Sequence, residues 1–171
     1  MPKEKPMKKK IILIGVVIVG LIIVSFLVKE KAKVTGAVVF KSYYPGGQIR
    51  EEGITRDGKL QGVFKSYFPT GHLKFEWFYK DGKKEGVAKF YFENGKLQAK
   101  VHYRGDLSDG VSKFYFENGK LQAEMNYKNG KLNGISKAYH PSGEIIYIDN
   151  YENGEMKTRK LLNEKGKPGV K

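Results

Sequence analysis

Apolar and polar residues alternate through residues 38–157, and the pattern recurs every 24 residues. Each period begins near a valine or isoleucine, and a lysine and then a tyrosine follow at every second position. Such alternation is typical of β-strands, in which successive side chains point to opposite faces of a sheet. Self-similarity at a fixed period predicts a repeat architecture. The chain divides into five repeats, 38–61, 62–85, 86–109, 110–133 and 134–157.

Each period holds two strand-like runs and two glycine turns, which predicts one β-hairpin per repeat. The first turn reads PGG, PTG, ENG, ENG and PSG in the five repeats. A two-residue turn needs positive φ at both central positions, and Thr70 resists that conformation because it is β-branched. A type I turn that ends in a left-handed glycine fits all five sequences, so we expect three-residue hairpin loops.

This loop length predicts the register of the third hairpin, with Tyr91 opposite Leu97 and Lys89 opposite Ala99. No second layer is evident in the sequence to cover such a sheet, so it must twist or curve for its aromatic columns to cover one another. We therefore expect an all-β repeat protein, in which five hairpins form an elongated, twisted antiparallel sheet. One face would carry Val87, Lys89, Tyr91, Leu97, Ala99, Val101 and Tyr103, and the other Ala88, Phe90, Phe92, Gln98, Lys100 and His102.

Ahead of the repeats, residues 11–28 are almost entirely aliphatic and contain no charge. As a helix they span roughly 27 Å, which matches the hydrocarbon core of a bilayer. The run is long for a cleaved signal peptide and is followed by KEKAK, so we predict an uncleaved signal anchor, a single transmembrane helix. Lysines in the basic segment 1–10 slightly favour a cytoplasmic N-terminus, with the repeats outside the cytoplasm. Residues 29–37 would be a linker, and 158–171 a polar, frayed tail.

The composition is strongly basic, with a formal net charge of +14, and contains no cysteine. The charge favours acidic partners, and the absence of cysteine excludes disulfides and thiolate chemistry. Three histidines occupy three different columns of the repeat, and the aspartates of the second turns suit turn chemistry. We predict no enzyme activity, no metal and no cofactor, and we do not expect nucleic-acid binding. The residues considered are His72, His102, His140, Asp57, Asp81 and Asp106.

The lysine and tyrosine columns are the candidate partner-binding residues, together with Trp77. Two readings of the lysine column stay open. Its stems could lie over tyrosine rings, or the column could line a groove that recognises acidic protein, lipid headgroups or an anionic polymer. The tyrosines and Trp77 could serve packing or anchor an interface. The columns are Lys41, Lys65, Lys89, Lys113 and Lys137, and Tyr43, Tyr67, Tyr91, Tyr115 and Tyr139.

The period G-x-x-K-x-Y-F-x-N-G-K-L-x-x-x-x-x-Y-x-x-G resembles the bacterial variant of the MORN repeat and is similar to YwqK-type antitoxins of toxin–antitoxin systems. The resemblance covers residues 38–157 and implies an elongated antiparallel sheet with a non-catalytic role in binding protein or phospholipid. Together with the anchor, it predicts a membrane-anchored scaffold that binds a protein or an anionic partner through its sheet. The alternative is an antitoxin or immunity protein that neutralises a toxin by direct contact.

Overall fold

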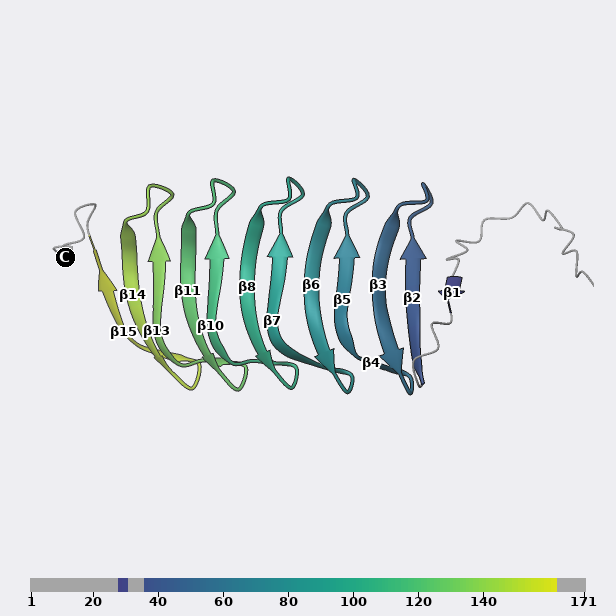
Figure 1. Ribbon diagram of the computed structural model, residues 1–171. Helices are drawn as coiled ribbons and strands as arrows, with labels where there is room; N and C mark the ends of the chain where they lie inside the picture. The colour runs from purple at the N-terminus through teal and green to yellow at the C-terminus, as the bar shows by residue number, and fades with distance from the viewer. Residues whose placement is uncertain (1–27, 31–35, 163–171) are drawn as a thin grey trace, which may run out of the picture.

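The computed structural model describes residues 28–30 and 36–162, and within them the chain forms one open antiparallel sheet (Figure 1). Neighbouring strands follow the chain from β1 at one edge to β15 at the other, and β4, β9 and β12 are short side strands. The strands are β1 (Val28–Glu30), β2 (Ala37–Tyr43), β3 (Ile49–Arg56), β4 (Lys59–Leu60), β5 (Gly62–Tyr67), β6 (Leu73–Lys80), β7 (Lys83–Tyr91), β8 (Leu97–Arg104), β9 (Leu107–Ser108), β10 (Gly110–Tyr115), β11 (Leu121–Lys128), β12 (Lys131–Leu132), β13 (Gly134–Tyr139), β14 (Ile145–Glu152) and β15 (Glu155–Leu161).

The five predicted repeats are confirmed as five hairpins, β2–β3, β5–β6, β7–β8, β10–β11 and β13–β14. Neither edge strand of the sheet was predicted. Val28–Glu30, assigned to the end of the anchor and the start of the linker, form β1, which pairs with β2. Residues 158–161, assigned to a polar tail, belong to β15, which pairs with β14 along its length. The C-terminal hairpin is thereby extended by one strand beyond the repeats.

Both kinds of turn follow from the residues that occupy them. In the first turn of the first repeat, Tyr44 N donates to Gln48 O at 2.8 Å and Gly47 N donates to Tyr44 O at 2.9 Å. Gly47 alone has a positive φ there, which confirms the three-residue loop. In the second turn, Asp57 and Gly58 both have positive φ, 51° and 76°, as a two-residue type I′ turn requires.

The faces predicted for the third hairpin are wrong from Ala99 onward, because a β-bulge shifts the register. Tyr91 does oppose Leu97, but Phe90 opposes Ala99, so that Gln98 is an extra residue without a partner. Lys89 consequently faces Lys100 and not Ala99. The same shift occurs at the same place in all five hairpins. A one-residue shift exchanges every later side chain between the two faces of a sheet.

The sheet thus has two distinct faces. The lysine face carries Lys89 and its equivalents, and the aromatic face carries Phe64, Trp77, Phe90 and their equivalents. Most of the buried residues lie on the aromatic face, where small side chains stand opposite large rings, as Ala99 does between Phe90 and Phe114. The rings cover their small neighbours, so Ala99 is 5% exposed and Ala88 2%. A single layer gains its core in this way.

The predicted anchor falls largely outside the described residues. Of residues 11–28, only Val28 is described, and it begins β1, which pairs with β2. Within the described ranges, no helix is long and apolar enough to cross a membrane.

Candidate partner-binding face

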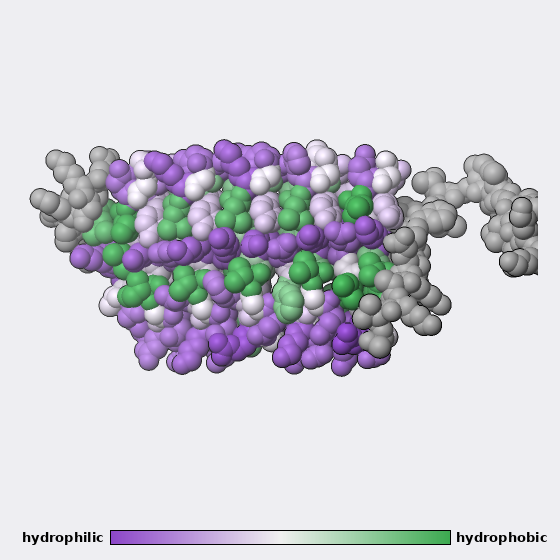
Figure 2. Space-filling view, viewed as in Figure 1, coloured by the Kyte–Doolittle hydropathy of each residue, from purple (hydrophilic) through white to green (hydrophobic). Residues whose placement is uncertain are grey.

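The lysine face is organised as three parallel rows that run across the strands. In Figure 2 a hydrophilic band crosses the middle of the sheet between two bands rich in hydrophobic side chains. Cross-strand pairing identifies the middle band, here called the charged row, as Lys41, Glu52, Lys65, Glu76, Lys89, Lys100, Lys113, Glu124 and Lys137. One flanking row holds the tyrosine column, and the other holds Val39, Ile54, Val63, Phe78, Val87, His102, Val111, Asn126 and Ile135.

Alternating charges stabilise the middle of this face. A residue of the intervening strand lies between each two lysines of the column, and at positions 52, 76 and 124 this residue is a glutamate. Lys89 Nζ lies 3.1 Å from Glu76 Oε1, and Lys113 Nζ lies 3.0 Å from Glu124 Oε1. The hydrogen bond from each lysine to its glutamate raises the pKa of both lysines. The bulge brings these glutamates to the lysine face.

Tyrosine hydroxyls complete the glutamate sites. Tyr67 donates to Glu52 Oε1 at 2.6 Å, and Lys41 Nζ lies 3.4 Å from Glu52 Oε2. The hydrogen bond from Tyr67 holds the pKa of the Glu52 carboxyl below its usual value. Burial, together with that hydrogen bond, raises the pKa of Tyr67 to about 12. Each such site therefore consists of a lysine and a glutamate of one repeat and the tyrosine of the next repeat.

Position 100 is the exception. The equivalent residue is a glutamate in the first, second and fourth repeats, whereas the third repeat has a lysine. Lys100 lies directly between Lys89 and Lys113, and no carboxylate of the described residues lies within ion-pair distance of it. A hollow of about 470 Å³ opens at this point, lined by Val87, Lys89, Lys100, His102, Val111, Lys113 and Tyr115. The comparable hollows at Glu52 and at Glu124 each contain a carboxylate, and this one contains none.

The apolar row beside the charged row is partly open to solvent. Val63 is 44% exposed, Phe78 45% and Ile135 45%, and Ile54, Val87 and Val111 of the same row are 38–39% exposed. Contiguous apolar surface next to ordered charge is typical of a surface that contacts another molecule. The lysine face therefore combines partly exposed apolar side chains with ordered charge.

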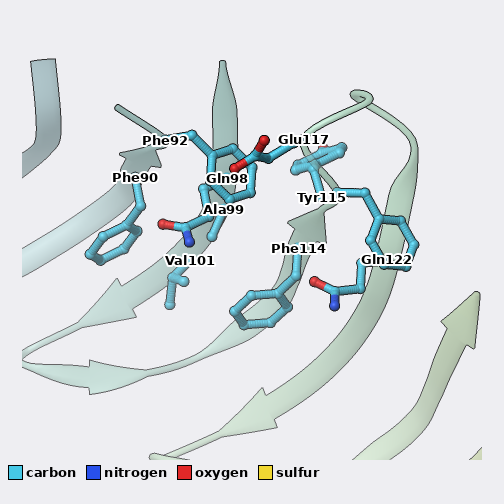
Figure 3. Close-up of a pocket in the computed structure, with 10 residues that line it drawn as sticks. Phe90, Phe92, Gln98, Ala99, Val101, Phe114, Tyr115, Glu117 and Gln122 are labelled. Atoms are coloured by element: carbon cyan, nitrogen blue, oxygen red, sulfur yellow. The ribbon is translucent and has the colours of Figure 1, made fainter. Parts of the chain in front are cut away.

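Trp77, predicted as a partner-binding candidate, lies on the opposite face from the lysine and tyrosine columns. Its ring stacks on Phe75 with centroids 4.9 Å apart, and Lys84 Nζ lies 3.8 Å from its ring centroid. The tryptophan is part of the packing of the aromatic face. Farther along the same face, Phe90 and Phe114 border a hollow of about 620 Å³ over Ala99 and Val101 (Figure 3).

The histidines have local hydrogen-bonding roles. His102 Nδ1 donates to the Val111 carbonyl, just as Asn126 Nδ2 donates to Ile135 O at 2.8 Å one repeat later. His102 therefore takes the place of an asparagine that ties neighbouring repeats together. Across the described ranges, no three histidine or acidic side chains come close enough to hold a metal ion.

The end of the array is held by a buried ion pair. Asp149 is 1% exposed, and Arg159 of β15 donates to its two oxygens, from Nε at 2.8 Å and from Nη2 at 2.7 Å. These bonds hold the pKa of the Asp149 carboxyl below its usual value. The guanidinium also stacks 4.3 Å from the ring centroid of Tyr147. The fifth repeat departs from the pattern here because Asp149 binds β15.

Comparison with known families now assigns the repeats. The model of the MORN repeat variant matches five consecutive segments, 38–57, 60–81, 84–104, 108–129 and 132–157. The chain belongs to this family. The matched segments coincide with the five hairpins, and successive matches are separated by the second turns. A search of curated proteins gives no match.

Sequence reasoning missed Lys100 and the three glutamates as members of the candidate surface. These residues were missed because the β-bulge was not predicted, and no residue type in the first turn indicates it. A signal was nevertheless available, because Glu52, Glu76, Lys100 and Glu124 are themselves spaced by the repeat period. A column of three acids interrupted by one base indicates a surface at which charge matters.

Proposed function

We propose that this MORN repeat variant protein is a non-enzymatic, membrane-anchored scaffold that binds a protein partner through its lysine face. The observation that carries the proposal is the three-row surface, with ordered charge between apolar side chains that stay partly exposed. The aromatic face is largely occupied by its own packing. Over the residues that the structure describes, the open sheet offers a broad contact area and no enclosed cavity of the type that enzymes use.

Membrane attachment rests on the sequence of residues 11–28, whose length and lack of charge suit a bilayer span. Anchoring would hold the repeats close to the membrane and would raise the local concentration of a membrane-bound partner. The lysine bias around the span supports repeats outside the cytoplasm.

The test is site-specific photo-crosslinking of the full chain in its native cells. A photoreactive residue replaces Phe78, in the exposed apolar row of the lysine face, and in a matched control it replaces Leu107, which is 49% exposed beside a second turn. We expect a discrete protein adduct at position 78 that is absent at position 107. Equal adducts at both positions, or none at either, would refute binding through this face.

The antitoxin alternative rests on the similarity of the repeats to YwqK-type antitoxins. It requires repeats in the cytoplasm if the toxin acts there, so topology discriminates between the two functions. Since the chain has no cysteine, Glu117→Cys would introduce a single thiol on an exposed loop. Labelling of intact cells by a membrane-impermeant thiol reagent would support the outward scaffold. Labelling only after lysis, together with fractionation that places the repeats in the cytoplasm, would favour the antitoxin.

A further inference from the structure

We propose that the hollow around Lys100 is a specificity site that receives one carboxylate side chain from an acidic segment of the protein partner. The inference rests on the proposed function, because it assumes that the lysine face binds a protein. It adds the chemical class of the group that is recognised and the residues that recognise it.

Charge balance is the first argument. Along the charged row, three consecutive lysines, Lys89, Lys100 and Lys113, are bounded by Glu76 and Glu124. The outer two lysines are already paired with those glutamates, at 3.1 and 3.0 Å. The site therefore carries one positive charge in excess. A single carboxylate would restore the balance, whereas a phosphate dianion would exceed it.

The geometry of the other repeats supplies the second argument. At Glu52 the pattern accommodates one carboxylate between flanking lysines, with the Tyr67 hydroxyl donating to it at 2.6 Å. Tyr115 follows Lys100 by the same number of residues as Tyr67 follows Glu52, and it lines the hollow. The hollow thus keeps its hydrogen-bond donors but lacks the carboxylate that accepts from them in the first and fourth repeats.

The apolar border of the hollow indicates a side chain of a protein and not a free ion. Val87 is 38% exposed and Val111 39%, and both lie beside the ammonium groups on the same face. A peptide that presents an acidic residue between apolar residues would cover the valines while its carboxylate meets Lys100. Charge complementarity between such a segment and three adjacent lysines then selects the partner.

The experiment uses the full chain in a non-ionic detergent and measures fluorescence anisotropy. The probe is a fluorescein-labelled peptide of alternating valine and glutamate, and the control peptide has glutamine in place of glutamate. Two variants with the same change of net charge are compared. Lys100→Glu places an internal carboxylate in the hollow, and Lys131→Glu changes an exposed lysine of β12, next to a second turn.

We expect Lys100→Glu to weaken binding of the glutamate peptide by about tenfold, and Lys131→Glu to leave it within about twofold. The glutamine peptide should bind weakly to all three proteins. Equal weakening by both variants would show a general charge effect and would overturn the proposal. So would a wild-type protein that does not distinguish the two peptides.

Two further measurements distinguish the proposed carboxylate site from a site for lipid headgroups or phosphate. Vesicles containing phosphatidylglycerol, and inorganic phosphate as a competitor, are tested with the same variants. If Lys100→Glu abolishes vesicle binding but spares the glutamate peptide, the carboxylate assignment is wrong. Photo-crosslinking from position 78 in the Lys100→Glu background distinguishes the two proposals. An unchanged native adduct there would leave the scaffold standing and refute only the site at Lys100.

Discussion

Replacing Lys100 by glutamate should stabilise the sheet while it removes the proposed recognition site. In the wild type, Lys100 faces an ammonium group on each side, across strands about 4.8 Å apart. Taking ~6 Å between the charges, each repulsion in water is about 0.7 kcal/mol, and screening at physiological salt reduces it to about 0.3 kcal/mol. Glutamate replaces two repulsions by two exposed attractions, each worth roughly 0.2–1 kcal/mol. The Tyr115 hydroxyl also gains an acceptor. The expected gain for Lys100→Glu is about 1.5 kcal/mol.

The gain can be measured by urea unfolding of the full chain in non-ionic detergent, followed by tyrosine and tryptophan fluorescence. Lys100→Gln is the matched variant, because it removes the repulsion without adding an attraction, and it should show about half of the gain. Both gains should shrink strongly at ~1 M salt, where the Debye length falls to about 3 Å. Lys131→Glu, with the same change of net charge, should show no comparable gain.

Two results would refute this reasoning. If Lys100→Glu is neutral or destabilising at low salt, the lysine side chains do not meet across the strands as the register implies. If the gain is the same at low and high salt, it has a cause other than charge. A stabilising Lys100→Glu that also loses the glutamate peptide would show that this position favours binding at the expense of stability.

Three further predictions address the packing and the end of the sheet. Gly53→Ala should lower the free energy of unfolding by about 1–3 kcal/mol, because an added Cβ would lie 3.1 Å from the ring of Phe40; an unchanged urea midpoint would contradict this. Ser112→Ala should raise stability by about 1 kcal/mol, since the hydroxyl is fully buried and has no hydrogen-bond partner among the described residues; a lower urea midpoint would contradict it. Arg159→Gln should destabilise β15 at pH 7 and less so at low pH. Because its pKa is lowered, Asp149 adds to stability at pH values above 3.8, the usual pKa of the group, and this contribution is lost as the pH falls through the folded-state pKa. Hydrogen exchange of the β15 amides at pH 7 and at low pH measures the effect, and equal destabilisation by Arg159→Gln at both pH values would contradict the prediction.

The hairpin repeat could be predicted from sequence because its signals are local. The glycine of each first turn, together with Thr70, which excludes positive φ at its position, determined the loop length. The period defined the repeat boundaries. Tyr91 opposite Leu97 followed directly from that loop. These features depend on residues adjacent in the chain, and pattern reasoning is reliable for them.

The faces could not be predicted because they depend on a bulge that has no residue-type signature here. Gln98 is the extra residue of the third hairpin, and its equivalents in the other repeats are Arg50, Lys74, Gln122 and Ile146, which share no single residue type. One uncounted residue transferred Ala99 to the aromatic face and Lys100 to the lysine face. Alternation alone therefore predicted which residues share a face within each strand of the third hairpin. It did not predict which face of the first strand continues into the second strand after the bulge.

In a periodic sheet, the residues that depart from the repeat pattern are the most informative about function. Asp149 breaks its column in the fifth repeat, and the break is compensated within the chain because Arg159 supplies both hydrogen bonds. Lys100 breaks its column in the third repeat, and the described chain supplies no compensating acid. Both replacements put a charge where the pattern has none or has the opposite sign, and each carries an electrostatic cost until it is paired. The first is paired inside the protein. The second, placed at the centre of the open face between two paired lysines, is positioned to be paired by a carboxylate of another protein.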